Sequence, residues 1–381
     1  GAEIKPGVLG INPYEYMMSS FKEVNFNTLN TSLALNQDLS VITKGLSLKA
    51  LVNFKNWSET SYTRSIKSNI YKVKDGSYNP ETGEYDYQLL QTGDQFLSQS
   101  GIGRNSDQTF YFDARLDWKR SFGDHNLTAM AMYMMREYRS DVLPNRNQGY
   151  SGRVTYDYAS KYLVEFNFGY NGSERLAAGH RFEFFPAVSA GWVASSENFW
   201  EPISKYINHF KIRGSYGLVG SDAFASGAPH FLYQNNIGIG SAHNFWTGLP
   251  TSEISKKGPG FYVLAVQDAG WEHVKKFDIG FDMMLFNQLN ITFDYFHDKR
   301  ERILMSRASW PSMLGYWGSK PWSNIGEVEN QGFELSLNWT KQFGKDLTLD
   351  LRGNFTYNQN EYKYVDEPSY PYVWQTNTGN C

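Results

Sequence analysis

The spacing in this sequence that most resembles a catalytic site is that of two pairs of aspartates. Asp113 and Asp117 lie four positions apart, as do Asp278 and Asp282. On a β-strand, this spacing places both carboxylates on one face but about 13 Å apart, at ~3.3 Å per residue. Glycosidases hold their two carboxylates roughly 5–9.5 Å apart. Because Arg115 also lies between the first two carboxylates, we interpret the pairs as hydrated charge ladders and predict no enzyme.

Other patterns of catalytic or metal-binding residues are missing from the sequence. It contains no HExxH, GxSxG, P-loop or CxxC motif. Its seven histidines show no metal-ligand spacing, and its one cysteine, Cys381, allows no disulfide. The acidic stretch 75–86 (DGSYNPETGEYD) could hold calcium, although a polar turn is the simpler interpretation. We therefore expect neither a metal site nor a cofactor.

Composition narrows the function classes further. The net charge is −3 and no basic run occurs, so we expect no nucleic-acid partner. No apolar run approaches the roughly 18 residues of a spanning helix. Aromatic residues make up 17% of the chain. Outer-membrane barrels concentrate aromatic side chains at both membrane interfaces, although lectin-like sandwiches are also rich in them.

The charged residues would be positioned by β-strands in which apolar and polar residues alternate. The clearest example is residues 152–171, GRVTYDYASKYLVEFNFGYN. Val154 and Tyr156 point to one face of its first strand, and Arg153 and Thr155 to the other. Side chains on a strand alternate with a period of two, so one face is aromatic and apolar while the other is polar. Repeated along a chain without long helices, this pattern is typical of a transmembrane β-barrel.

Twelve segments follow this pattern, with ends uncertain by about two to four residues, and the facing of the fourth, Met-rich segment is left open. They cover residues 24–37, 45–57, 107–119, 126–138, 152–158, 162–171, 186–194, 208–218, 275–285, 288–297, 333–339 and 347–355. Mostly short connections follow the odd-numbered segments. Longer ones follow most of the even-numbered segments, notably 58–106, 219–272 and 298–330. This rhythm predicts a barrel with short turns at one rim and long loops at the other.

Two sets of residues are candidates for the functional site. Eight charged residues are predicted to face a water-filled lumen: Arg115, Asp117, Arg153, Glu165, Arg213, Asp278, Asp350 and Arg352. Five loop aromatics could stack on a ligand: Phe245, Trp246, Trp310, Trp317 and Trp322. Tyr370, Tyr372 and Trp374 form a similar group near the end of the chain. For all these aromatics, contact with a partner protein and packing within the loops remain alternatives.

Several blocks resemble the barrel core of SusC/RagA-type TonB-dependent outer-membrane transporters. The most specific are LPNRNQGYSGRVTYDY (143–158), KYLVEFNFGYNGSERL (161–176) and RFEFFPAVSAGW (181–192). Others are KIRGSYGLVGSD (211–222) and NIGEVENQGFELSLNW (324–339). The resemblance implies an antiparallel barrel in the outer membrane, with a plug domain and with energy supplied through TonB. It also implies a SusD-like surface lipoprotein over the loops and import of oligosaccharides or peptides.

The resemblance also sets an expectation for domain organisation. Residues 1–381 would form part of one all-β barrel domain, with about 12 of an expected 22 strands. The plug and the closing strands would lie outside the chain. The start, GAEIKPGVLG, lacks a signal-peptide pattern, as expected of either a mature form or a fragment. The loop-like end YPYVWQTNTGNC, which has no closing strand, favours a fragment. The alternatives are a soluble carbohydrate-binding β-sandwich, whose apolar faces would meet each other, and a passive outer-membrane porin.

Overall fold

The computed structural model describes residues 13–224, 228–247, 254–311, 313 and 320–380. Its contacts divide the chain into two units, which we describe separately. The smaller unit comprises residues 1–32, 53–110 and 138–144, and the larger comprises 33–52, 111–137 and 145–381.

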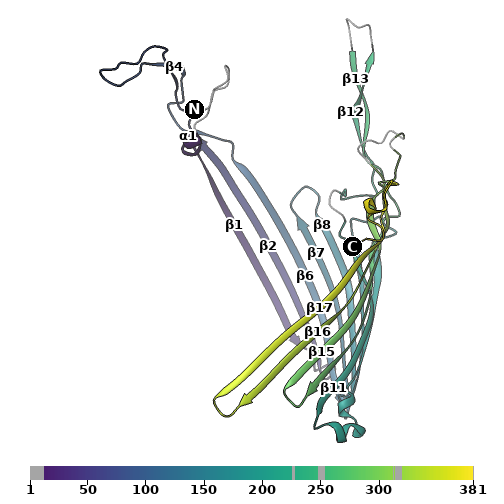
Figure 1. The fold of residues 1–381 in the computed structure, drawn as a ribbon. Coiled ribbons are helices and arrows are strands. Elements are labelled where there is room, and N and C mark those ends of the chain that lie inside the picture. The colour runs from purple at the N-terminus through teal and green to yellow at the C-terminus, as the bar shows by residue number, and fades with distance from the viewer. Residues whose placement is uncertain (1–12, 225–227, 248–253, 312, 314–319, 381) are drawn as a thin grey trace. The chain divides into compact units, whose positions relative to one another are not determined.

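Twelve strands pair in sequence order, which confirms the predicted all-β antiparallel fold (Figure 1). They are β1 (Ser20–Asp38), β2 (Leu46–Ser65), β6 (Gly103–Phe122), β7 (His125–Arg139), β8 (Asn145–Tyr158), β9 (Tyr162–Ser173), β10 (Phe182–Trp192), β11 (Ile207–Ser221), β14 (Glu272–Leu285), β15 (Leu289–Ser306), β16 (Trp322–Phe343) and β17 (Leu347–Tyr364). Each of the twelve alternating segments of the sequence is one of these strands. The two-residue strand β5 (Ser98–Gln99) pairs with β2.

The smaller unit holds a short helix, α1 (Pro13–Met18), and a two-stranded sheet of β3 (Ile70–Val73) and β4 (Tyr87–Gln91). The acidic stretch 75–86 connects these two strands. A bridge between Asn79 and Glu84 closes it into a polar turn. This agrees with the simpler of the two interpretations that the sequence left open.

The larger unit contains strands that run well past their predicted ends on the long-connection side. β15 continues to Ser306 and β16 begins at Trp322, so the connection between them spans only residues 307–321. Alternation is lost in the extension of β15 because residues 298–302 are all charged and residues 303–305 are all apolar. A further hairpin, β12 (Asn236–Thr247) and β13 (Ile254–Val263), lies within the predicted connection 219–272. Its segments lack a regular alternation of apolar and polar residues.

Short turns join β8 to β9 and β14 to β15. Ala159 and Ser160 have φ angles of 52° and 56°, and Phe286 and Asn287 have 55° and 52°. Two consecutive left-handed residues form the turn whose twist matches that of paired strands. Two other connections depart from the predicted rhythm. The link 193–206 is extended by the 3-10 helices η1 (Ala194–Ser196) and η2 (Asn198–Ile203), and the link 140–144 is short.

The strand registers separate the sheet into two chemically distinct faces. One row crosses eight strands through Tyr156, Val164, Ala190, Gly214, Ile279, Tyr295, Phe333 and Tyr357. The next row crosses the same strands through Asp157, Leu163, Gly191, Arg213, Gly280, Asp294, Glu334 and Thr356. Because neighbouring rows point to opposite sides, the first row belongs to an apolar face and the second to a polar face.

In the described part of the larger unit, apolar side chains of this face are exposed and not covered by other segments. Val164, Leu349 and Phe355 are 47%, 42% and 56% exposed. The two buried apolar clusters of the described chain lie elsewhere, at strand ends and in the long connections. One contains Leu176, Phe185 and Trp271, and the other Leu232, Ala269 and Leu304. A soluble sandwich would bury its apolar faces against each other, so this arrangement favours a membrane barrel over that alternative.

Candidate functional site

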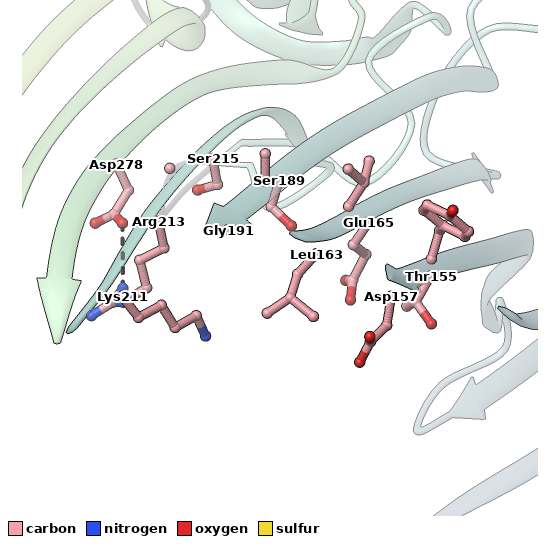
Figure 2. A pocket seen from close by; sticks show the side chains of 14 residues that line it. Thr155, Asp157, Leu163, Glu165, Ser189, Gly191, Lys211, Arg213, Ser215 and Asp278 are labelled. Atoms are coloured by element: carbon pink, nitrogen blue, oxygen red, sulfur yellow. Dashed lines mark ion pairs between the residues drawn. The ribbon is translucent and has the colours of Figure 1, made fainter. Parts of the chain in front are cut away.

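A charged hollow of about 450 Å³ lies on the polar face of the larger unit (Figure 2). Strands β8, β9, β10, β11 and β14 supply its polar lining, which consists of Thr155, Asp157, Glu165, Ser189, Lys211, Arg213, Ser215 and Asp278. Figure 2 shows Asp157, Glu165 and Lys211 projecting from three different strands into one open space. These are residues that alternate in sequence with the apolar row, so register alone brings them together.

Gly191 leaves room at the floor of the hollow. A Cβ atom there would lie 3.3 Å from Cε of Lys211 and 3.5 Å from Cδ1 of Leu163. The Lys211 side chain can therefore lie across β10 without displacing a neighbour. Within the described residues, its ammonium has no carboxylate partner.

Arg213 links three carboxylates across two neighbouring strands. Its Nη2 atom lies 2.8 Å from Oδ2 of Asp294, its Nε atom 3.4 Å from Oδ2 of Asp282, and its Nη1 atom 3.7 Å from Oδ1 of Asp278. The side chain is 33% exposed. Asp278 and Asp282 therefore share one cation, an arrangement compatible with a charge ladder.

Gly280 makes the contact between Arg213 and Asp294 possible. Gly280 lies opposite both residues, on the strand between theirs. A Cβ atom at this position would come within 2.1 Å of Oδ1 of Asp294. Any larger residue would therefore displace the carboxylate that the guanidinium reaches. Asp294 was missed from the sequence because only the register reveals this pairing.

The other charged candidates also lie on the polar face. Arg153 donates to Oδ1 of Asn167 at 2.7 Å and lies 3.5 Å from Glu165. Asp350 accepts a 2.6 Å hydrogen bond from Thr340, and Arg352 lies opposite Asn338.

Arg115 and Asp117 also lie on the polar face, and a series of ring contacts from β6 to β8 shows this. Phe112 contacts Tyr133, which in turn contacts Tyr150 on the apolar face. Odd-numbered residues of β6 must therefore point to the opposite side. There, Nε of Arg115 lies 3.0 Å from Oδ2 of Asp117, and Lys49 lies 3.7 Å from the same oxygen.

The five predicted loop aromatics fall on different elements, as far as the described residues show. Phe245 and Trp246 are part of β12, where they lie opposite Lys256 and Ser255 in the hairpin. Trp322 packs against the cluster of Leu232, Ala269 and Leu304, which is the packing alternative. The indole nitrogen of Trp310 is buried without a hydrogen-bond partner among the described residues. Trp317 lies outside the described residues.

The described chain offers no evident metal centre and no helical membrane span. No group of three or more His, Cys, Asp and Glu side chains in the described ranges is placed to hold a metal ion. Within the same ranges, no helix is both long and apolar enough to cross a membrane.

Comparison with known proteins identifies the family. The family model described as "TonB dependent receptor-like, beta-barrel" matches residues 5–380. The chain belongs to the TonB-dependent receptor family. This confirms the resemblance of the sequence blocks and assigns this β-barrel chain to the outer membrane.

Two curated relatives show how much of such a receptor the chain represents. TonB-dependent receptor P3 of Formosa agariphila is 32% identical over 304 residues, which cover 70% of this chain and 29% of that protein. TonB-dependent receptor SusC of Bacteroides thetaiotaomicron is 25% identical over 324 residues, covering 81% and 28% respectively. The chain therefore spans less than a third of the length of these receptors.

Solved structures agree in fold. The RagAB peptide transporter superposes with a TM-score of 0.68 at 18% identity, covering 91% of this chain and 38% of that one. The outer-membrane transporter YddB from Escherichia coli gives a TM-score of 0.53 at 12% identity, covering 90% and 43%. At such low identity the likeness concerns the fold alone.

In this receptor chain, Glu197 ties the link 193–206 to the ends of two strands. Its carboxylate accepts hydrogen bonds from the Tyr162 hydroxyl at 2.8 Å, Lys161 Nζ at 3.0 Å and the Trp192 indole at 3.5 Å. The Tyr162 hydroxyl and then the Lys161 ammonium hold the pKa of Glu197 below its ordinary value. The link lies at the short-turn end of the strands, where an amphipathic Tyr–Trp pair suits a membrane interface.

We expect Glu197→Gln to destabilise the receptor at neutral pH and to have less effect in acid. A carboxylate whose pKa is lowered by folding stabilises the folded state above its unfolded-state pKa, near 4.5. That stabilisation is lost as the pH falls through the lower pKa of the folded state. Urea unfolding of the refolded receptor over a pH series measures the difference between variant and wild type.

Glu201→Gln provides the matched control, because the Glu201 side chain makes no ion pair within the described residues. Its effect on unfolding should be small at every pH. If the effect of Glu197→Gln were instead the same at neutral and acid pH, the hydrogen-bonded carboxylate would not be the stabilising group.

Proposed function

We propose that this chain forms part of the barrel wall of a TonB-dependent importer of oligosaccharides or peptides. The observation that carries the proposal is the separation of an apolar face and a charged face across eight strands in register. The apolar face would contact outer-membrane lipid. The charged face would line the lumen, with Arg115, Asp117, Arg153, Glu165, Arg213, Asp278, Asp350 and Arg352 directed into it.

A solved relative supports the peptide class, and the resemblance of the sequence blocks to SusC/RagA-type transporters supports the oligosaccharide class. SusC is named as a TonB-dependent receptor, and the RagAB structure is that of a peptide transporter. By analogy, we propose a SusD-like lipoprotein that covers the loops, and a plug, outside the chain, that couples to TonB. On the wall itself, most charges are paired with a neighbour of opposite sign. Such a wall stays hydrated without attracting ligands of one charge, which suits the passage of neutral or zwitterionic molecules.

Charge reversals at the pair of Arg153 and Glu165 test the lumen assignment in the full-length receptor. The ligand would first be found as a nutrient whose use is lost on deletion of the receptor and restored by the wild-type gene. Arg153→Glu alone places two carboxylates side by side and should change the rate of uptake severalfold at an unchanged amount of receptor in the membrane. The double variant Arg153→Glu with Glu165→Arg restores the pair and serves as the control.

Two results would contradict the proposal in different ways. Loss of membrane insertion in the single variant would show that the polar face does not meet water. Uptake that continues after the proton gradient is collapsed would favour a passive porin over a TonB-dependent importer.

A further inference from the structure

The residues that follow β17 form a closed loop, which we call the terminal loop (365–380). The carboxylate of Glu367 holds its two ends together. One oxygen of Glu367 lies 2.9 Å from the backbone nitrogen of Asn377, and the other lies 3.1 Å from that of Thr378. These N–H groups hold the pKa of Glu367 below its ordinary value. The loop then returns to β17, where the nitrogen of Gly379 donates to the oxygen of Tyr362 at 2.7 Å.

A second anchor fixes the base of the terminal loop to the connection 307–321. Asp366 is buried, and its carboxylate accepts hydrogen bonds from the Ser309 hydroxyl at 2.7 Å and from Arg307 Nε at 3.3 Å. Pro368 and Pro371 further restrict the backbone between the anchors. The loop is therefore held in shape before any ligand arrives, which lowers the entropic cost of binding.

This constrained loop displays aromatic side chains to solvent. Tyr372 is 53% exposed and Trp374 is 77% exposed. Their rings stack on each other at 4.6 Å between centroids, with 12° between their planes. Each ring covers one face of the other, so an outer face of Trp374 stays free. Packing within the loop accounts for the contact between these two rings, but it leaves Trp374 77% exposed.

The chemistry around the aromatic pair indicates what could cover it. No charged residue occurs between Pro368 and Asn380, and the charge of Glu367 is engaged by N–H donors. The exposed surface offers instead an aromatic face and the amide group of Gln375. An aromatic face contacts the C–H groups of a sugar ring, and an amide both donates to and accepts from its hydroxyls. A charged peptide would find no counter-ion on this loop.

We infer that the terminal loop binds a neutral sugar ring, which stacks on Trp374. The inference rests on the proposed function and deepens it, because it selects neutral oligosaccharides over peptides as the ligand class. The site would make the first contact with ligand at the rim opposite the short turns.

Binding of the purified full-length receptor to printed arrays tests this inference. One array carries neutral and acidic oligosaccharides and the other carries peptides. We expect the wild-type receptor to bind neutral oligosaccharides, and Trp374→Ala to weaken this binding by about tenfold or more, as for a central aromatic contact. Trp374→Phe retains a ring and should keep part of the affinity.

Two further variants test whether sugar binding depends specifically on Trp374 and on the fixed shape of the terminal loop. Phe199→Ala removes another exposed aromatic, 63% accessible, from the opposite rim and should leave binding unchanged. Glu367→Ala keeps both aromatic rings but releases the loop, so we expect weaker binding together with faster amide hydrogen exchange at residues 368–378.

The outcomes divide clearly. Absence of binding to every neutral oligosaccharide, binding to peptides alone, or equal binding by Trp374→Ala and the wild type would each overturn the inference. Energised uptake, measured separately in cells, tests the proposed function. If Trp374→Ala imports its ligand as well as the wild type does, the proposed function stands and the sugar site at Trp374 is excluded.

Discussion

Replacing Val188 with arginine should lower the free energy of unfolding by about 2–4 kcal/mol and strongly reduce the amount of receptor in the outer membrane. Val188 is 48% exposed on the apolar face, opposite Phe166 on one side and Tyr216 on the other. Its position near the middle of β10 places it deep in the proposed hydrocarbon layer. An arginine there must carry its charge into lipid, where the cost is greatest. Urea unfolding in lipid vesicles and quantification of the receptor in isolated outer membranes measure the two effects.

The next residue along β10 provides the control. Ser189 points to the polar face and lines the charged hollow. Ser189→Arg adds the same charge to the same strand, yet we expect normal insertion and a change in stability of no more than about 0.5 kcal/mol. If both variants inserted equally well, or if only Ser189→Arg failed, the assignment of the two faces would be wrong.

The second large effect is expected from Arg213→Met. This change removes the cation from among Asp278, Asp282 and Asp294 while keeping an unbranched apolar side chain. Loss of one partner from a buried ion pair costs about 3–5 kcal/mol. Because Arg213 is 33% exposed, water screens part of this cost, and we expect about 1–3 kcal/mol by urea unfolding.

A double-mutant cycle shows whether the three carboxylates cause the loss. Asp294→Asn removes the carboxylate closest to the guanidinium, so adding it to Arg213→Met should recover part of the stability. Lys211→Met is the matched control on the same strand and face, since Lys211 lacks a carboxylate partner in the described structure. A loss as large for Lys211→Met as for Arg213→Met would argue against a specific role of the Arg213 network.

These variants also concern how the polar face of the sheet would interact with a passing ligand. Arg213 offsets part of the negative charge of three carboxylates within a small area, and Arg115 forms a one-to-one pair with Asp117 on β6. We expect such paired charges to hold water at the wall without trapping a passing ligand. The terminal loop has the opposite character, because its exposed surface is aromatic and uncharged. Capture at the rim and passage along the wall would therefore depend on different chemistry.

The sequence by itself determined the strands and their two faces. Each of the twelve alternating segments forms a strand, and the apolar set around Val164 is separated from the polar set around Glu165 across the sheet. This was possible because the side-chain period of a strand is fixed at two, so the pattern of residue types assigns faces without knowledge of neighbours. The sequential strand order follows from connections that are mostly too short to pass over another strand.

Only the tertiary structure decided which side chains meet. The contact between Arg213 and Asp294 spans 81 positions and depends on a glycine at position 280 of the strand between them. The packing of Trp322 and the anchoring of the terminal loop by Asp366 to Ser309 likewise join segments that no local pattern relates. Register and loop packing are set by many weak contacts between distant parts of the chain, whereas alternation is a local property of each strand. The alternation of residue types therefore predicted a sheet with one apolar and one polar face. The Arg213 network and the exposed aromatic pair of the terminal loop were evident only from the folded structure.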